Sequence, residues 1–232
     1  MIPLKDENPS KTIPVVNIFL ILTNISVFIY LNYFAPVATR SIIFKLGFIP
    51  YELSHFVDIN PKNLVPIPLT IFTAMFMHGG WLHLLSNMLY LWIFGDNIED
   101  ILGHTKYLFF YVMCGIAATL VHGFININSQ VPTLGASGAI AGVLGAYMFL
   151  FPKARIKTLV ILFVVIQIVH IPAVIMLGYW ILLQVLSAYA EHGSRAGGGI
   201  AWFAHIGGFV AGLVLIIMMK KPGRRRYPKK WK

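Results

Sequence analysis

Residues 15–34 read VVNIFLILTNISVFIYLNYF, a run of twenty residues without a charged side chain. A helix of about twenty apolar residues is long enough to cross the hydrocarbon core of a bilayer. Of the 232 residues in the chain, 58% are hydrophobic and only 11% are charged, whereas soluble domains have about a quarter charged. The sequence therefore predicts an all-α protein that crosses a membrane several times.

The number of spans depends on the apolar stretch 156–190, which at 35 residues is too long for a single helix across the bilayer. The other apolar runs after the first are clear, and they lie at 81–95, 107–127, 137–151 and 200–219. Lysine and arginine concentrate on cytoplasmic loops. Here they gather before residue 15, at 153–157 and after residue 219, and only one span within 156–190 places all three clusters on one side.

We therefore predict six transmembrane helices in one bundle, with the fifth near Pro172–Ala190. Residues 156–171 should pack against that helix or lie at the membrane interface. The proline-containing stretch 35–69 reads as a long first external loop with short pieces of structure. The expected division of the chain is a cytoplasmic N-terminal segment at 1–14, the six-helix domain at 15–219 and a basic cytoplasmic tail at 220–232.

The net charge of +10 raises the question of a nucleic-acid partner. Eight of the eighteen lysines and arginines lie between Lys220 and Lys232, directly after an apolar run. A basic tail in that place attracts anionic lipid. No recognition helix or aromatic-basic platform accompanies it, so we expect the lipid bilayer as a partner and no nucleic acid. The N-terminus has no small-residue cleavage site and no targeting extension, which favours a retained first helix in a prokaryotic cytoplasmic membrane.

The motif Gly135-Ala136-Ser137-Gly138 opens the fourth apolar run after a polar loop. Glycines on both sides of a serine permit close backbone approach and an exposed hydroxyl. The first N–H groups of a helix have no intrahelical partner and can bind developing negative charge. Ser137 is thus a candidate nucleophile. It is equally well read as an N-cap in a glycine-rich packing helix.

A histidine inside the last apolar run is the candidate base. His205, Gly208 and Gly212 lie within about 60° of one another on a helix of 3.6 residues per turn. The glycines allow another helix to approach closely on the face that carries His205. If the small-residue faces of the fourth and sixth helices pack together, His205 can meet Ser137. The alternative is a structural histidine bonded to a neighbouring helix.

A third set of polar residues opens the second apolar run. His83 and Asn87 are four residues apart, so they project from one face of a helix and offer two donors at one depth for an oxyanion. His78 comes five residues before His83 and belongs in the preceding turn.

A metal site and a carboxylate site are weaker interpretations. A metal site joining His78, His83 and His205 would lack a helical H-E-x-x-H motif and a carboxylate at that depth, so we predict no metal. Three carboxylates, Asp96, Glu99 and Asp100, lie at the cytoplasmic end of the second run, opposite Ser137, where we expect them to cap structure rather than act in chemistry.

These blocks, in this order, resemble the rhomboid family of intramembrane serine proteases. The shared features are His78…His83-x-x-x-Asn87, Gly135-x-Ser137-Gly138 and Ala204-His205-x-Gly207-Gly208-x-x-x-Gly212. The resemblance covers about residues 15–219 and implies a six-transmembrane-helix rhomboid-like bundle. It also implies that Ser137 is the nucleophile and His205 its base, in a dyad without an acidic third member.

By the same resemblance, the Ser137 backbone N–H would hold the oxyanion together with His83 and Asn87. Gly135 and its neighbours would line a site near the outer face, and no cofactor would be needed. Substrates would be proteins with transmembrane helices, cut near their outer ends at small residues; the oligomeric state is left open. Some rhomboids stack the histidine on an aromatic residue four positions after the serine. That position is Ala141 here, so what orients His205 is open.

Two other classes of protein compete with a protease. A catalytically silent rhomboid-like protein would bind membrane-protein clients without cutting them, but such proteins usually lack the serine or the histidine. A transporter would show inverted repeats and a polar cluster at the midplane, neither of which we find. Residues 193–199 could form a mobile cap over the site or a plain flexible loop.

Overall fold

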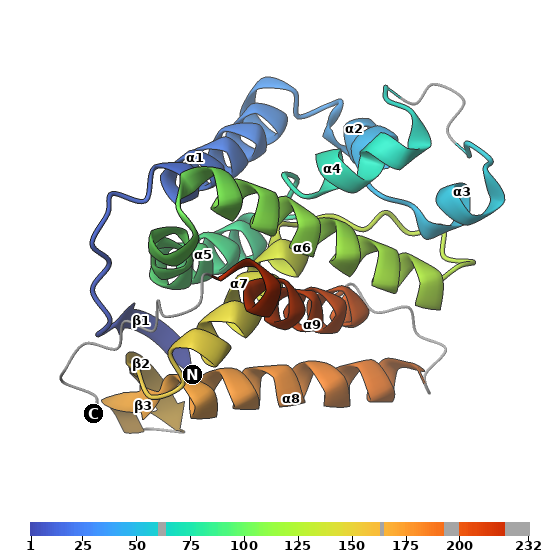
Figure 1. Cartoon of the computed structure of the whole chain (residues 1–232). Helices are drawn as coiled ribbons and strands as arrows, with labels where there is room; N and C mark the ends of the chain where they lie inside the picture. The colour runs from blue at the N-terminus through green and yellow to red at the C-terminus, as the bar shows by residue number, and fades with distance from the viewer. Residues whose placement is uncertain (60–63, 163–164, 193–199, 221–232) are drawn as a thin grey trace.

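The computed structural model describes residues 1–59, 64–162, 165–192 and 200–220 (Figure 1). Residues 193–199, for which a cap and a plain loop were both considered, and the basic tail beyond Lys220 lie outside these residues. The chain begins with β1 (Ile2–Asp6), α1 (Val15–Ile29), the π-helical η1 (Tyr30–Phe34), α2 (Thr39–Leu46), α3 (Pro50–His55), the 3-10 helix η2 (Ile67–Leu69) and α4 (Thr70–Ala74). It continues with α5 (Trp81–Leu102), α6 (His104–Ile125), α7 (Ser137–Leu150), β2 (Arg155–Leu162), β3 (Val165–Pro172), α8 (Ala173–His192) and α9 (Trp202–Met219).

Four helical stretches are long and apolar enough to cross a membrane: 15–34, α6, most of α8 and α9. The two remaining expected spans differ from these. α7 is apolar but has only 14 residues, and α5 has 22 residues but carries carboxylates near its end. The protein is thus a mostly helical membrane protein. The count of six spans stays a prediction for α5 and α7, as does the external position of the segment with α2, α3 and α4.

A three-stranded antiparallel sheet corrects the expected all-α class. β2 pairs with β3 from Arg155–Pro172 to Leu162–Val165, and β1 adds to the other edge of β2. The apolar run 156–171 is rich in the β-branched residues valine and isoleucine, which favour a pleated strand. The sheet packs against the start of α8, where the Thr158 hydroxyl lies 3.6 Å from the sulfur of Met176.

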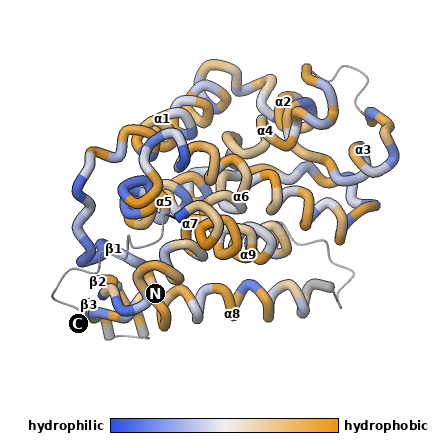
Figure 2. The backbone as a smooth tube through the Cα atoms, viewed as in Figure 1, coloured by the Kyte–Doolittle hydropathy of each residue, from blue (hydrophilic) through white to orange (hydrophobic). Residues whose placement is uncertain are grey.

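The carboxylates of α5 hold the N-terminal segment, as their expected capping role requires. Glu99 accepts hydrogen bonds from the backbone N–H groups of Val16 (2.9 Å) and Asn17 (2.8 Å), in the first turn of α1. Asp100 accepts from Thr12. The free N–H groups of a helix start are thus satisfied by a neighbouring helix. Figure 2 shows hydrophilic colour along this N-terminal segment, in contrast to the hydrophobic colour of most of α9.

α7 lies at the centre of the bundle, with α5, α6, α8 and α9 around it (Figure 1). Its residues from Gly138 to Tyr147 are all buried. Its closest neighbour is α9, because glycines face backbone on the partner helix. A Cβ added to Gly212 would overlap the backbone of Gly142, and one added to Gly208 would overlap the Gly138 carbonyl oxygen. The expected packing of the two small-residue faces is confirmed.

Candidate active site

Ser137 is the first residue of α7, and the loop before it is anchored at two points. Phe48 and Thr133 exchange backbone hydrogen bonds of 3.0 and 2.7 Å, and the Gly135 N–H donates to the Ala74 carbonyl oxygen at 2.9 Å. Ala136 is the N-cap residue, and no side chain caps the helix. The alternative in which Ser137 is an N-cap is therefore wrong, and its hydroxyl is available for another partner.

That partner is His205, in the first turn of α9. The Nε2 atom of His205 lies 2.8 Å from the Ser137 Oγ atom. The close approach of α7 and α9 at Gly138 and Gly208 permits this short distance, because a side chain at Gly208 would hold the two helix starts apart. The structure thus joins the two residues that the sequence singled out, although they are 68 positions apart.

Two residues of α8 that sequence reasoning did not identify also contact His205. The Oε1 atom of Gln184 lies 2.7 Å from the other ring nitrogen, Nδ1. The Trp180 ring lies beside the imidazole, with 5.8 Å between ring centroids and 37° between the planes. Gln184 is an amide that follows eleven residues without a charged or amide side chain in α8, and a polar residue inside such a span marks functional positions in membrane proteins. The sequence alone could therefore have pointed to Gln184 as a functional residue. Its contact with His205 is visible only in the structure.

His83 and Asn87 lie on α5, and the His83 ring is next to Gly135. Gly135 has a φ of +125°, a region that favours glycine, and a Cβ there would stand 2.7 Å from His83 Nε2 and 3.7 Å from Ser137 Oγ. His83 Nε2 and Ser137 Oγ therefore both border the space that a side chain at Gly135 would fill. Asn87 is buried, and its Nδ2 atom has no hydrogen-bond partner in the part of the chain that the structure describes.

His78 lies before α5, outside any helix, and is buried. Its ring meets that of His83 edge to face, with centroids 5.0 Å apart. The two imidazole rings are therefore in contact, and a supporting role for His78 stays a prediction. His205 does not complete a three-histidine metal site with this pair, because its two nitrogens face Ser137 and Gln184.

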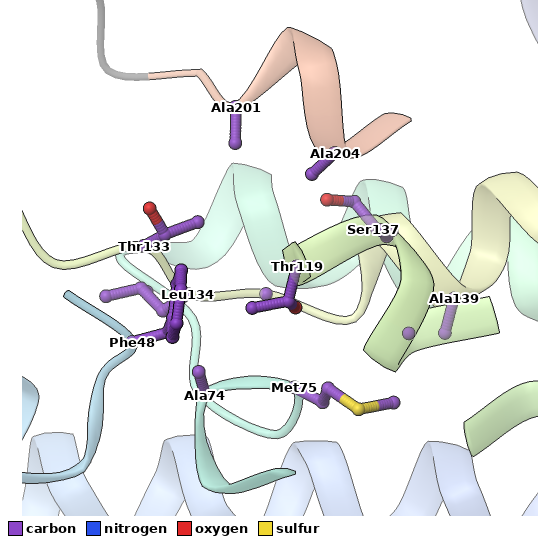
Figure 3. Close-up of a pocket in the computed structure, with 14 residues that line it drawn as sticks. Phe48, Ala74, Met75, Thr119, Thr133, Leu134, Ser137, Ala139, Ala201 and Ala204 are labelled. Carbon is purple, nitrogen blue, oxygen red and sulfur yellow. The ribbon is translucent and has the colours of Figure 1, made fainter. Parts of the chain in front are cut away.

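A small cavity of about 20 Å³ borders the Ser137 side chain. Figure 3 shows Ser137 beside Ala204 of α9, with Ala74 and Met75 on the opposite wall. A cavity of this size has room for one water molecule. The arrangement combines a hydroxyl, an imidazole on that hydroxyl, a buried amide on α5 without a partner among the described residues, and space for water. Together these features suit hydrolysis of an acyl group.

Comparison with known proteins decides the family. The model of the Rhomboid domain matches residues 68–222, which is more than half of the chain. The chain belongs to the rhomboid family. This rhomboid is 32% identical over 158 residues to "Rhomboid protein 1, mitochondrial" of Saccharomyces cerevisiae, a match covering 66% of the chain and 42% of the yeast protein.

Two further rhomboid relatives show similar levels of identity. "Rhomboid-like protein 11, chloroplastic" of Arabidopsis thaliana is 27% identical over 157 residues, covering 64% of the chain and 51% of the relative. "Presenilin-associated rhomboid-like protein, mitochondrial" of Homo sapiens is 31% identical over 125 residues, covering 52% and 33%. The chain spans about half of the length of these relatives or less. Their names point to organelles and give no support to the expected prokaryotic membrane.

Proposed function

We propose that this rhomboid is a serine endopeptidase that hydrolyses peptide bonds in or near the transmembrane helices of other membrane proteins. The observation that carries the proposal is the 2.8 Å distance between His205 Nε2 and Ser137 Oγ inside an apolar bundle. A serine hydroxyl is a weak nucleophile until a base accepts its proton, and a neutral imidazole nitrogen at hydrogen-bond distance can do so.

In the first step, Ser137 Oγ attacks the carbonyl carbon of the scissile bond while its proton passes to His205 Nε2. The carbonyl oxygen becomes negative and is stabilised by the Ser137 backbone N–H, His83 and Asn87. Asn87 suits this role because its buried amide nitrogen has no other partner among the described residues. His205 then protonates the leaving amine, which gives an ester between Ser137 and the substrate.

In the second step, water hydrolyses this ester. His205 accepts a proton from the water molecule, the resulting hydroxide attacks the ester carbonyl, and Ser137 recovers its hydroxyl proton from His205. The cavity beside Ser137 supports this step, because it offers a place for one water next to the reacting atom. None of these steps calls on a cofactor.

The membrane setting restricts the substrate. A carbonyl within an intact helix is already hydrogen-bonded, so a transmembrane substrate must unwind locally before it reaches Ser137. We therefore propose substrates with helix-breaking or small residues near the outer end of a span. In the proposed topology both termini are cytoplasmic and the dyad faces the outer half of the membrane.

The test is cleavage of a fluorogenic single-span substrate in liposomes by the intact protein, Ser137→Ala and His205→Ala. Ser26→Ala, which removes an exposed hydroxyl from α1, is the matched control. The proposal requires that the intact protein and the control cut, and that both dyad variants stay folded but inactive. If none of the four cuts, the chain is better described as a silent rhomboid-like protein that binds membrane-protein clients. If all four cut equally, Ser137 and His205 are not the catalytic residues.

A further inference from the structure

The dyad of the proposed function leaves one requirement unmet within α7 and α9. An imidazole can rotate and can carry its proton on either nitrogen, and only one combination presents a lone pair to the serine. Ala141, four residues after Ser137, has no ring on which His205 could stack. Trp202 of α9 meets the imidazole edge to face, with 6.2 Å between ring centroids, but a ring contact does not select the nitrogen that carries the proton. Among the described residues, the hydrogen bond that can fix the proton on Nδ1 comes from another helix.

α8 supplies it through Gln184, whose side chain is 7% exposed. Its amide nitrogen, Nε2, lies 3.2 Å from the backbone carbonyl oxygen of Trp180. A carbonyl oxygen only accepts hydrogen bonds, so the NH₂ side of the amide must face Trp180. The amide oxygen, Oε1, must then face His205, whose Nδ1 lies 2.7 Å away.

The direction of the remaining bonds follows from this. Because Oε1 only accepts, His205 Nδ1 must carry the ring proton and donate it to Gln184. The other nitrogen, Nε2, is then unprotonated and accepts the hydrogen bond from the Ser137 hydroxyl. We propose that Gln184 is a positioning residue that fixes the tautomer and the orientation of His205, a role that rests on the proposed function of the dyad.

Trp180 contributes to the same task in two ways. Its carbonyl oxygen fixes the direction of the Gln184 amide, and its ring packs beside the imidazole at 5.8 Å. Trp180 and Gln184 are four residues apart, so they lie on one face of α8 and contact His205 together. This face of α8 takes the place of the stacking partner that Ala141 does not provide.

The experiment compares Gln184→Glu with Gln184→Met by the kcat and KM for a single-span substrate. Glutamate keeps an acceptor oxygen at the same reach, whereas methionine has a similar length but a thioether that accepts hydrogen bonds only weakly. We expect Gln184→Met to lower kcat by about ten- to hundredfold with KM unchanged, because the imidazole loses its directing bond. Gln184→Glu should keep a kcat close to that of the intact protein. Gln167→Met, at an exposed position of β3, is the matched control and should cut normally.

Reaction with a fluorophosphonate probe gives a second reading that does not depend on substrate binding. The rate at which Ser137 is labelled should fall in Gln184→Met in step with kcat, while the Tm stays within a few degrees of the intact protein. Full kcat in Gln184→Met, or equal losses in the glutamate and methionine variants, would overturn the positioning role alone. Failure of the proposed function is recognised separately, because the intact protein would then cut no better than Ser137→Ala.

Discussion

Gly208 of α9 contacts the backbone of Gly138 of α7 so closely that adding one methyl group at position 208 should displace the Ser137–His205 dyad. In Gly208→Ala the new Cβ would overlap the Gly138 carbonyl oxygen, which is backbone and cannot rotate away. The two helices must separate by about 1.5 Å before the contact becomes an ordinary van der Waals distance. Such overpacking costs about 1–3 kcal/mol, more than the roughly 1 kcal/mol that alanine gains over glycine in a helix.

The same displacement acts on the reacting atoms, because Gly138 follows Ser137 and Gly208 lies one helical turn from His205. A misplacement of about 1 Å can cost on the order of a hundredfold in rate. We therefore expect Gly208→Ala to lower the rate of substrate cleavage in liposomes about a hundredfold and to lower the Tm in detergent. The matched control is Gly178→Ala in α8, where a Cβ would meet nothing within 4 Å.

Gly178→Ala should keep full activity and a Tm that is unchanged or slightly higher. The reasoning is refuted if Gly208→Ala cuts as fast as Gly178→Ala, or if its loss of activity comes without any change in Tm. The first result would mean that the dyad does not depend on the helix separation. The second would mean that the effect of Gly208 is not one of packing.

Three other perturbations test separate parts of the structure. Asn87→Ala should lower kcat about 10²–10³-fold with little change in Tm, because it removes a proposed oxyanion donor that has no other partner among the described residues; an unchanged kcat would exclude Asn87 from the oxyanion site. Glu99→Gln should destabilise the protein by about 1–2 kcal/mol in denaturant titration, since it weakens the cap on the first turn of α1; equal stability would contradict that role. Burial raises the pKa of Asp6, in β1, from 3.8 to about 7 even though the Tyr147 hydroxyl donates to it. Between these pH values the folded protein holds a proton that the unfolded chain has released, so the Tm should fall as the pH rises from 4 to 7, and Asp6→Asn should flatten that slope.

The apolar helices could be predicted closely, because length and charge decide them. The first run was expected at 15–34 and is helical throughout, as α1 and η1. The last was expected at 200–219, and α9 is Trp202–Met219. The second was expected to end at Gly95, where carboxylates begin, yet α5 continues to Leu102. Those carboxylates are bonded to the N-terminal segment, a long-range contact that local sequence does not reveal.

The hairpin of β2 and β3 shows a different limit. A continuous apolar run is compatible with a buried helix and with a strand, and periodicity alone cannot separate them. Its content of valine and isoleucine was a usable signal for strands. The third strand, β1, was not predictable, because Ile2–Asp6 becomes a strand only by pairing with residues 150 or more positions later.

The residues of the candidate active site also differ in how far the sequence could predict them. Ser137, His205, His83 and Asn87 could be chosen from the sequence because each is a polar residue in or beside an apolar run with glycines nearby. Gln184 has the same character, but its role depends on the rotation of α8 about its axis, which a stretch of almost uniformly apolar residues does not specify. Residue types can therefore suggest the members of a dyad, while the group that orients it becomes visible only from helix packing.

The position of Ser137 is determined from both ends of α7, which links the site to the sheet. At the start of the helix the loop is tied to Phe48 and Ala74 through backbone hydrogen bonds. Near its other end, Tyr147 donates to Asp6 of β1 at 2.7 Å. Along its length, backbone contact with the glycines of α9 leaves no room for sliding. A short helix held at three places keeps its first residue, Ser137, in a fixed position. The imidazole of His205 extends from α9, and Gln184 and Trp180 of α8 contact its other side. The close fit at the dyad is therefore a property of the packed bundle rather than of any single motif.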